Sequence, residues 1–481
     1  MAFASIVTLL LFYYIRPQDW MPGMSGFNMV KLAVAGGIIG LMQRSRDEPR
    51  WRFMSSPQEW ALVIFLGYVV FTAAEPMGAL TDLGVLVVFA FLGLHTLTTE
   101  QLLERYLRWW LGALIGILCM VAITMAGLDF TNARALIDTM EGRWCLGTYT
   151  MNNPNAMGHT LVAILPLGYF LWFWSGSALN RVRTALLFAF GLWAIIPTQS
   201  KGAFISGTIS FLVSVLFGRK LIVQVIVGLL ALAMGGTILA MLPRMEQLKR
   251  IGSEEGVQGR MLAWGMARTV TQTHSTGMGY KNFHAWIRTD GVLNEKAPHS
   301  AFVMVGGDLG PVGLTLYIGM LLACARSLIQ YKGLSFTMER CRRCLFALLM
   351  GLFVSGWMLD RAYYTEVFCL VGAVGAYHLL SVKQRREAAM AELTAETAEN
   401  EAPEAPFGLP SFQAKSTSTM LVSKAADDAD DSLVEAYLGP SETLEVPGLW
   451  TRLGLLDLAF AIIGGQLALK FWDYVMTTIK P

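Results

Sequence analysis

The stretch NEKAPHSAFVMVGGDLGPVGLTLYIGMLL, residues 294–322, carries the pattern that decides the fold. His299 follows a proline at the start of a long apolar run, and Asp308 lies inside that run. A helix that crosses a membrane needs about 20 mostly apolar residues to span a hydrocarbon core roughly 30 Å thick. The run therefore predicts a membrane span with an imidazole at its edge and a carboxylate about two and a half turns deeper.

The whole chain has the composition of a membrane protein. Of its 481 residues, 54% are hydrophobic and 15% are charged, and the mean hydropathy is +0.49. A soluble protein carries roughly 25% charged residues. We therefore predict an all-α polytopic membrane protein with about twelve transmembrane helices. The expected spans lie near 2–15, 29–42, 60–75, 79–97, 109–127, 157–174, 185–198, 202–217, 220–242, 299–330, 345–358 and 362–381.

Lysine and arginine residues in the short loops predict the orientation of these spans. Basic residues follow every even-numbered span, as at Arg105 and Arg108 after the fourth. This pattern puts the amino terminus and the even exits in the cytoplasm. The large loop 243–298 then lies outside, although it holds eight basic residues against five acidic ones. Because this excess opposes the insertion bias, we expect an anionic ligand there.

The carboxyl-terminal part of the chain differs from the membrane domain expected at 1–382. Residues 387–445 hold thirteen acidic residues and two lysines, a net charge of −11. Such a composition cannot bury a core, so we expect 383–450 to be a largely disordered cytoplasmic tail. The apolar segment within 451–481 predicts a membrane-associated helix, either a thirteenth span or a helix in the interface.

Two short polar segments fall on the outer side of the predicted membrane domain. In the first, Asn152, Asn153 and Asn155 precede the sixth span, where amides either cap a helix or hydrogen-bond sugar hydroxyls. In the second, Lys201 begins a helix after a very short turn. A helix amino end with a lysine suits a phosphate, but a lysine there also snorkels to lipid headgroups.

The outer loop supplies the remaining candidate residues. Arg260 and Trp264 are four residues apart and share one face of an expected helix. The arginine either docks on headgroups or binds a diphosphate with its guanidinium fork. His299 lies at the membrane boundary, and Asp308 either faces a polar cavity or is held structurally by an arginine or amide partner.

These segments, in this order, resemble the O-antigen ligase and O-antigen polymerase superfamily of bacterial envelope glycosyltransferases. Members have about twelve spans and one large periplasmic loop between spans 9 and 10. The amino-terminal RPQDWMPG, residues 16–23, looks like relatives linked to exopolysaccharide or exosortase loci. Over roughly residues 1–382 the family motifs match Asn153-Pro154-Asn155, Ser200-Lys201-Gly202, Arg260 with Trp264, Gly277-Met278-Gly279-Tyr280-Lys281-Asn282-Phe283, His299-Ser300 and Asp308-Leu309-Gly310.

The resemblance implies transfer of a glycan from a polyprenyl-diphosphate donor to an acceptor hydroxyl, at the periplasmic face of the bacterial inner membrane. It implies an inverting reaction that needs no metal or other cofactor. Arg260 and Lys201, with Arg361 as a further candidate, would bind the diphosphate, and His299 would deprotonate the acceptor. Asp308 would orient the ring or stabilise the pocket. The glycan-contact candidates are Asn152, Asn153, Asn155 and Trp264.

Three positions depart from the family pattern. Lys201 stands where arginine is common, which turns a bidentate phosphate grip into a point charge. Ser300 replaces an asparagine, and Asp308 replaces a glutamate. No motif of the family covers the acidic tail or the last apolar helix.

Several readings stay open at the level of sequence. The acceptor is another repeat unit, a lipid A core or a protein hydroxyl, and the amino-terminal likeness favours a polymerase or an exopolysaccharide ligase. A lipid-linked glycan flippase or transporter is the alternative from a different class. A third reading is a scaffold whose tail recruits cytoplasmic partners. Membrane lipid is an expected partner and nucleic acid is not.

Overall fold

The computed structural model describes residues 1–24, 29–43, 51–217, 222, 225–226, 228–229, 255–289, 297–400, 450 and 452–478. Most of the predicted span at 220–242, the loop residues 243–254 and 290–296, and the tail residues 401–449 lie outside the described residues. The chain divides into two units. Met1–Ser381 with Thr451–Pro481 forms one, and Val382–Trp450 forms the other.

The described residues are helical and contain no β-strand. Four helices lie between or beside the main helices of the bundle: α2 (Pro17–Trp20), α7 (Ala133–Thr139), α13 (Glu255–Thr273) and α14 (Asn282–Thr289). The longer helices are α1 (Ala2–Tyr14), α3 (Met29–Met42), α4 (Pro57–Thr72), α5 (Pro76–Thr96), α6 (Glu100–Met125), α8 (Pro154–Val162) continued by α9 (Ile164–Leu171), α10 (Ala178–Ile195), α11 (Lys201–Leu216), α15 (Ala301–Gln330), α16 (Phe336–Gly356), α17 (Thr365–Asn400) and α20 (Leu455–Thr478).

The helices have the length and composition that a membrane requires. Within the described residues, six helical segments are long and apolar enough to cross a bilayer, those of α5, α6, α10, α15, α17 and α20, and four shorter apolar helices accompany them. The chain is therefore an all-α protein with several candidate membrane spans, as its composition predicts. The number of twelve spans stays a prediction.

Short polar residues begin many of the helices because they satisfy backbone N–H groups that have no partner inside the helix. Ser56 starts α4 with a capping box in which Glu59 reciprocates its hydrogen bond. Ser200 caps α11 and Ser300 caps α15, each accepting from the N–H group three residues later. The serine that departs from the family pattern at position 300 thus defines where α15 begins.

Helix α15 is interrupted at Gly310-Pro311, where Gly310 has φ 67° and ψ −171°. Proline lacks the N–H group that would bond the carbonyl oxygen of Gly307, four residues back. The turn before α14 supplies the missing donors: Met278 N–H bonds Gly307 O at 3.0 Å, and Gly279 N–H bonds Asp308 O at 2.7 Å. The glycine-rich motif 277–283 therefore repairs the broken helix through its backbone.

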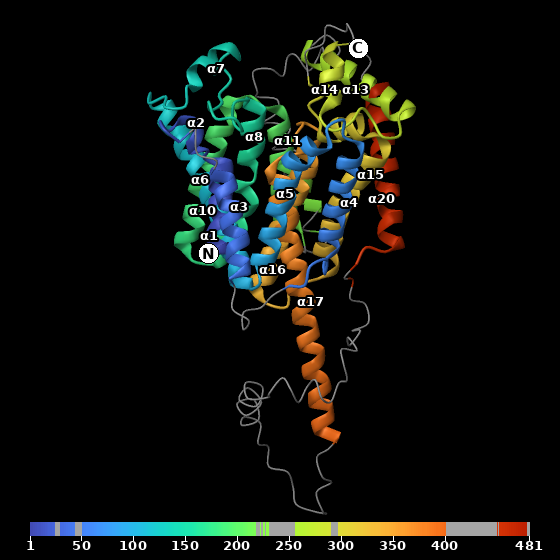
Figure 1. Ribbon diagram of the computed structural model, residues 1–481. Coiled ribbons are helices and arrows are strands. Elements are labelled where there is room, and N and C mark those ends of the chain that lie inside the picture. The colour runs from blue at the N-terminus through green and yellow to red at the C-terminus, as the bar shows by residue number, and fades with distance from the viewer. Residues whose placement is uncertain are drawn as a thin grey trace, which may run out of the picture. The chain divides into compact units, whose positions relative to one another are not determined.

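The turn approaches α15 so closely that only glycine fits at the crossing. A Cβ atom on Gly277 would lie 2.4 Å from Gly310 N, and one on Gly310 would lie 2.3 Å from Ser275 O. Both glycines also have positive φ angles, which side chains with a Cβ rarely adopt. We call the end of the bundle that carries α13 and α14 the loop end, and Figure 1 shows both helices there beside the start of α15.

Candidate functional site

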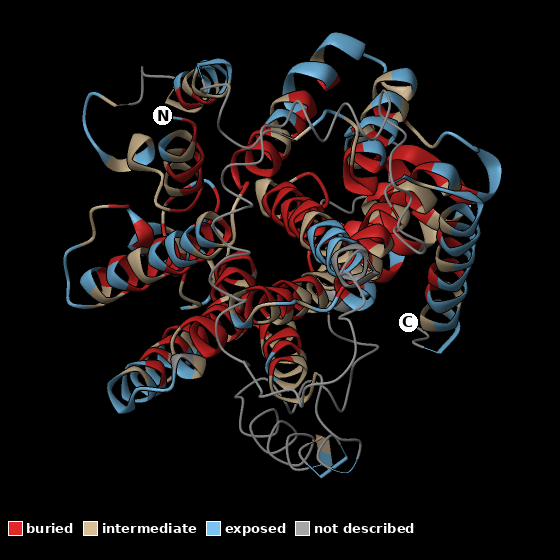
Figure 2. Ribbon diagram, turned by 90° about the horizontal axis from the view of Figure 1, so that it is seen from below, coloured by how far each residue is buried: buried red, intermediate tan, exposed pale blue. Residues whose placement is uncertain are grey.

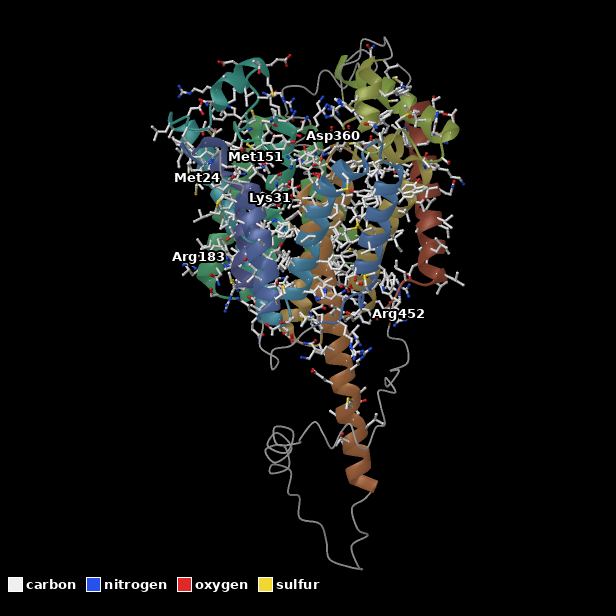
Figure 3. The ribbon with its side chains drawn as sticks, in the orientation of Figure 1. Met24, Lys31, Met151, Arg183, Asp360 and Arg452 are labelled. Carbon is white, nitrogen blue, oxygen red and sulfur yellow. The ribbon has the colours of Figure 1, made fainter. Side chains whose placement is uncertain are left out.

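His299 lies at the loop end, in the short segment between α14 and α15. Its backbone has φ 47°, and Ser300, the next residue, caps α15. The Nδ1 atom of His299 lies 3.9 Å from Oδ1 of Asp360, whose place at the loop end is labelled in Figure 3. This separation is too long for a hydrogen bond. The imidazole therefore stands beside a carboxylate without being bonded to it.

Titratable groups from three separate segments act electrostatically on the ring. Arg260 comes from α13, His284 from α14 and Arg143 from the segment between α7 and α8. Burial, followed by the charge of Arg260, lowers the pKa of His299 below its ordinary value. Asp360 acts in the opposite direction, and His284 and Arg143 add to the lowering. The arrangement keeps the imidazole neutral near pH 7, the form that accepts a proton.

Arg260 and His299, which the sequence predicts to act together, are thus brought to one place by the fold. Trp264, one turn after Arg260, fixes the segment before the histidine. Its indole Nε1–H donates to the carbonyl oxygen of Pro298 at 2.8 Å, and the side chain is buried. Its ring packs against Trp357 at 6.2 Å between centroids. Trp264 therefore positions His299, and its predicted contact with glycan stays a prediction.

Asp308 is not the carboxylate nearest to His299. It is fully buried, and its Oδ1 accepts the backbone N–H of Phe283 at 3.0 Å. This bond holds the first turn of α14, the helix that carries His284. The partner of Asp308 is thus a backbone amide, which agrees with a structural role for this residue. Asp360 is the carboxylate beside the His299 ring.

The asparagine segment is tied to the turn that precedes Lys201. Asn153 caps α8 by accepting the N–H of Asn155 at 2.9 Å, and Asn152 is exposed. The Oδ1 atom of Asn155 accepts from Arg143 at 2.7 Å, and Arg143 also donates to Thr198 O at 3.0 Å. Arg143 carries no motif of its own, although it lies in a predicted outer loop beside the asparagines.

Lys201 is the first residue of α11, directly after the Ser200 cap, as the sequence predicts. The following glycine allows α11 to approach α8 closely. A Cβ atom on Gly202 would lie 2.8 Å from Nε2 of His159. The start of α11 therefore sits against the buried His159, and the phosphate contact of Lys201 stays a prediction.

Arg361, the third predicted diphosphate ligand, is buried at the turn between α16 and α17. It donates to Oγ1 of Thr160 at 2.9 Å, to Oε1 of Glu366 at 3.2 Å and to the carbonyl oxygen of Thr150. Burial acts to lower the pKa of Arg361, but the charge of Glu366 and the contributions of nearby tyrosines together outweigh burial, and the net shift is upward. These bonds join α8, α17 and the loop before α8, so Arg361 holds the loop end together.

A small internal cavity of about 70 Å³ lies next to this arginine. Its polar lining comes from His159, Thr160, Ser355, Arg361 and Glu366. Nδ1 of His159 lies 2.6 Å from the hydroxyl of Ser355. This volume equals that of about two water molecules in the liquid.

Cys341 and Cys344, whose spacing is typical of metal or redox pairs, are buried free thiols on α16. Outside the masked segments, no group of three or more histidine, cysteine or acidic side chains is arranged to hold a metal ion. The site thus consists of an imidazole, a carboxylate and nearby cations.

Compared with known proteins, the chain matches no protein-family model and no curated sequence. The chemistry of the site follows from its own residues. Cations that converge beside a neutral imidazole suit the binding of an anion next to a hydroxyl that loses its proton.

Proposed function

We propose that this protein is a membrane glycosyltransferase of the polysaccharide polymerase or ligase type. It transfers a glycan from a polyprenyl-diphosphate donor to an acceptor hydroxyl at the loop end, on the periplasmic face of the inner membrane. The acceptor is a repeat unit, a lipid core or a protein hydroxyl. The amino-terminal RPQDWMPG favours polymerisation or exopolysaccharide ligation.

The observation that carries this proposal is that the Trp264–Pro298 hydrogen bond holds α13, the helix of Arg260, against the segment of His299 at the start of α15. The charges of Arg260, Arg143 and His284 act on the ring there. A polyprenyl donor has its tail in lipid and its diphosphate at the headgroup level, where we expect Arg260 and Arg143 to lie. The acceptor arrives from water on the same side. A base at the edge of a span, surrounded by positive charge, meets both requirements.

The reaction needs one proton transfer and one displacement. His299 takes the proton of the acceptor hydroxyl while the oxygen of that hydroxyl forms a bond to the anomeric carbon of the donor. The bond from that carbon to the diphosphate oxygen breaks, and the electron pair leaves with the diphosphate. Arg260 and Arg143 stabilise the charge that develops on the leaving group. Attack opposite the leaving group inverts the anomeric centre.

The direct test uses purified protein with a lipid-linked glycan donor and an acceptor glycan. His299→Ala and Arg260→Ala are expected to reduce transfer about 100-fold or more, the range for general bases and charge-stabilising groups. Matched controls are His274→Ala, which removes an exposed histidine, and Arg183→Ala, which removes an exposed arginine of α10. Figure 3 labels Arg183 away from the loop end. Full activity in both site variants at normal protein levels would eliminate the catalytic roles.

A carrier for lipid-linked glycans is the second candidate because α15 is broken inside an apolar span. Transporters use such interrupted helices near their substrate sites. The Gly310-Pro311 break supports this reading. Movement of the donor across proteoliposomes without formation of a glycosidic product would favour the carrier, and product formed in detergent solution would favour the enzyme.

A further inference from the structure

The last helix, α20, runs along α15 in the opposite direction (Figure 1). It begins near the far end of α15, where Arg326 pairs with Asp457. It ends at the loop end, where Arg268 of α13 pairs with Asp473. Figure 3 labels Arg452, just before α20, at the end of the bundle opposite to Asp360. The helix therefore covers the whole length of a predicted membrane span.

Small residues bring the two helices close together. A Cβ atom on Gly465 would lie 2.5 Å from Oγ1 of Thr315, and one on Gly464 would lie 2.8 Å from Cδ1 of Leu322. From the other side, a Cβ on Gly319 would lie 2.9 Å from that of Ala461. Close approach at small residues is how helices associate in a membrane, where burial of apolar surface drives little.

The opposite face of α20 is apolar although it is exposed, and Figure 2 shows this helix at the edge of the bundle with pale exposed residues along it. Water would not favour such a face, but hydrocarbon does. Three side chains on this face are between 54% and 60% exposed: Phe460, Ile463 and Leu467. Lipid is thus the environment that this face fits.

At the loop end, α20 contacts the helix that carries Arg260. The guanidinium of Arg268 donates to both carboxylate oxygens of Asp473, at 2.5 and 2.8 Å. Trp472 is fully buried, and its ring lies 6.4 Å from that of Trp264. A Cβ on Gly306 of α15 would lie 3.0 Å from the Trp472 ring. Trp472 therefore fills the space between α13 and α15.

We propose that α20 is an additional membrane span whose outer end holds α13 over the site, with Asp473 and Trp472 as positioning residues for Arg260 and His299. The catalytic part of this inference rests on the proposed glycosyltransferase function. The distance from the Arg268–Asp473 ion pair to Arg260 is short, because Arg268 follows Arg260 by only eight residues on one helix, about 12 Å at the helical rise. Trp264, between them, bonds the carbonyl of Pro298. A shift of α13 would move the guanidinium and the imidazole together.

The crossing is tested first by thiol labelling of single cysteines in intact cells with a membrane-impermeant maleimide. Tyr474→Cys is expected to react and Arg452→Cys to react only after the membrane is opened. Tyr474 is 64% exposed, which makes it a suitable probe. Labelling of both positions in intact cells, or of neither, would overturn the crossing. This experiment does not depend on any enzymatic activity.

The positioning role is tested by charge exchange, with hydrogen exchange of α13 and glycan transfer as two readouts. Asp473→Arg and Arg268→Asp are each expected to reduce amide protection in α13 and to lower transfer about tenfold, and the double exchange to restore both, since contacting residues couple in this way. Lys470→Glu is the matched control, because Lys470 is exposed on the same helix.

The outcomes separate the two proposals. If the single variants lose amide protection in α13 and the double charge exchange restores it, the positioning contact is supported. This holds even if the wild-type protein transfers no glycan, because the absence of transfer would remove only the proposed function. Unchanged protection in Asp473→Arg and Trp472→Ala would overturn the positioning role. Protection that changes while transfer stays at the wild-type level would also overturn it, because α13 could then move without effect on the reaction.

Discussion

Replacing Gly310 by alanine should destabilise the protein strongly, although alanine normally stabilises helices. The backbone at Gly310, φ 67° and ψ −171°, lies in a region used almost only by glycine, and a side chain there adds about 1–3 kcal/mol of strain. The new Cβ would also lie 2.3 Å from the carbonyl oxygen of Ser275. Because that neighbour is backbone, it cannot rotate away, and such overpacking adds about another 1–3 kcal/mol.

The assay is thermal denaturation of the purified protein in detergent, followed by the fraction that remains monodisperse on size exclusion. At roughly 2 °C per kcal/mol for a large chain, the midpoint of Gly310→Ala should fall by about 4–12 °C. Gly112→Ala is the matched control, since nothing lies within 4 Å of a Cβ there and alanine is favoured in a helix by about 1 kcal/mol. A Gly310→Ala midpoint equal to the wild type would refute the proposed docking of the 275–279 turn on α15.

Two further predictions concern the charges beside His299 and the buried hydrogen bond of Asp308. Arg260→Gln removes a positive charge, so it should raise the pKa of His299 and move the acid limb of the residual pH–activity profile to higher pH. Asp360→Asn removes a negative charge, so it should lower the pKa of His299 and move the acid limb to lower pH. Shifts of the acid limb in the same direction in both variants would contradict the geometry. Asp308→Ala leaves the buried N–H of Phe283 without its acceptor and should destabilise the protein by about 1–3 kcal/mol, seen as a lower melting midpoint. Asp308→Asn keeps an acceptor oxygen and should lose less, and an equal loss in both would assign the effect to the charge.

The sequence predicted the secondary structure well because apolar runs and capping residues act locally. The runs at 60–75, 79–97 and 202–217 appear as α4, α5 and α11, within a few residues at each end. Asn153 caps α8 in the structure, one of the two roles that its position before a proline allows. These features depend on neighbours a few residues apart, so the pattern of the chain contains them.

The partners in the site were harder to predict because they come from segments distant in the chain. Asp360 precedes Arg361 in the predicted outer turn, but the sequence led us to predict a role only for the arginine. The histidine at 284 follows Phe283 in the glycine-rich motif without any signal of its own. Asp360, Arg361 and His284 lie in predicted outer loops, as does Arg143. Grouping the titratable residues by the predicted side of the membrane would have found them.

The sequence by itself determined that this chain forms apolar helices of membrane-spanning length, since hydrophobicity and helix capping are properties of short stretches. Only the tertiary structure decided that Asp360 stands beside His299, that Asp308 holds α14, and that α20 lies along α15 with Asp473 on Arg268. Each of these contacts joins residues brought together by helix packing. The packing depends on glycine positions and crossing geometry over the whole bundle, which no local pattern of residues specifies.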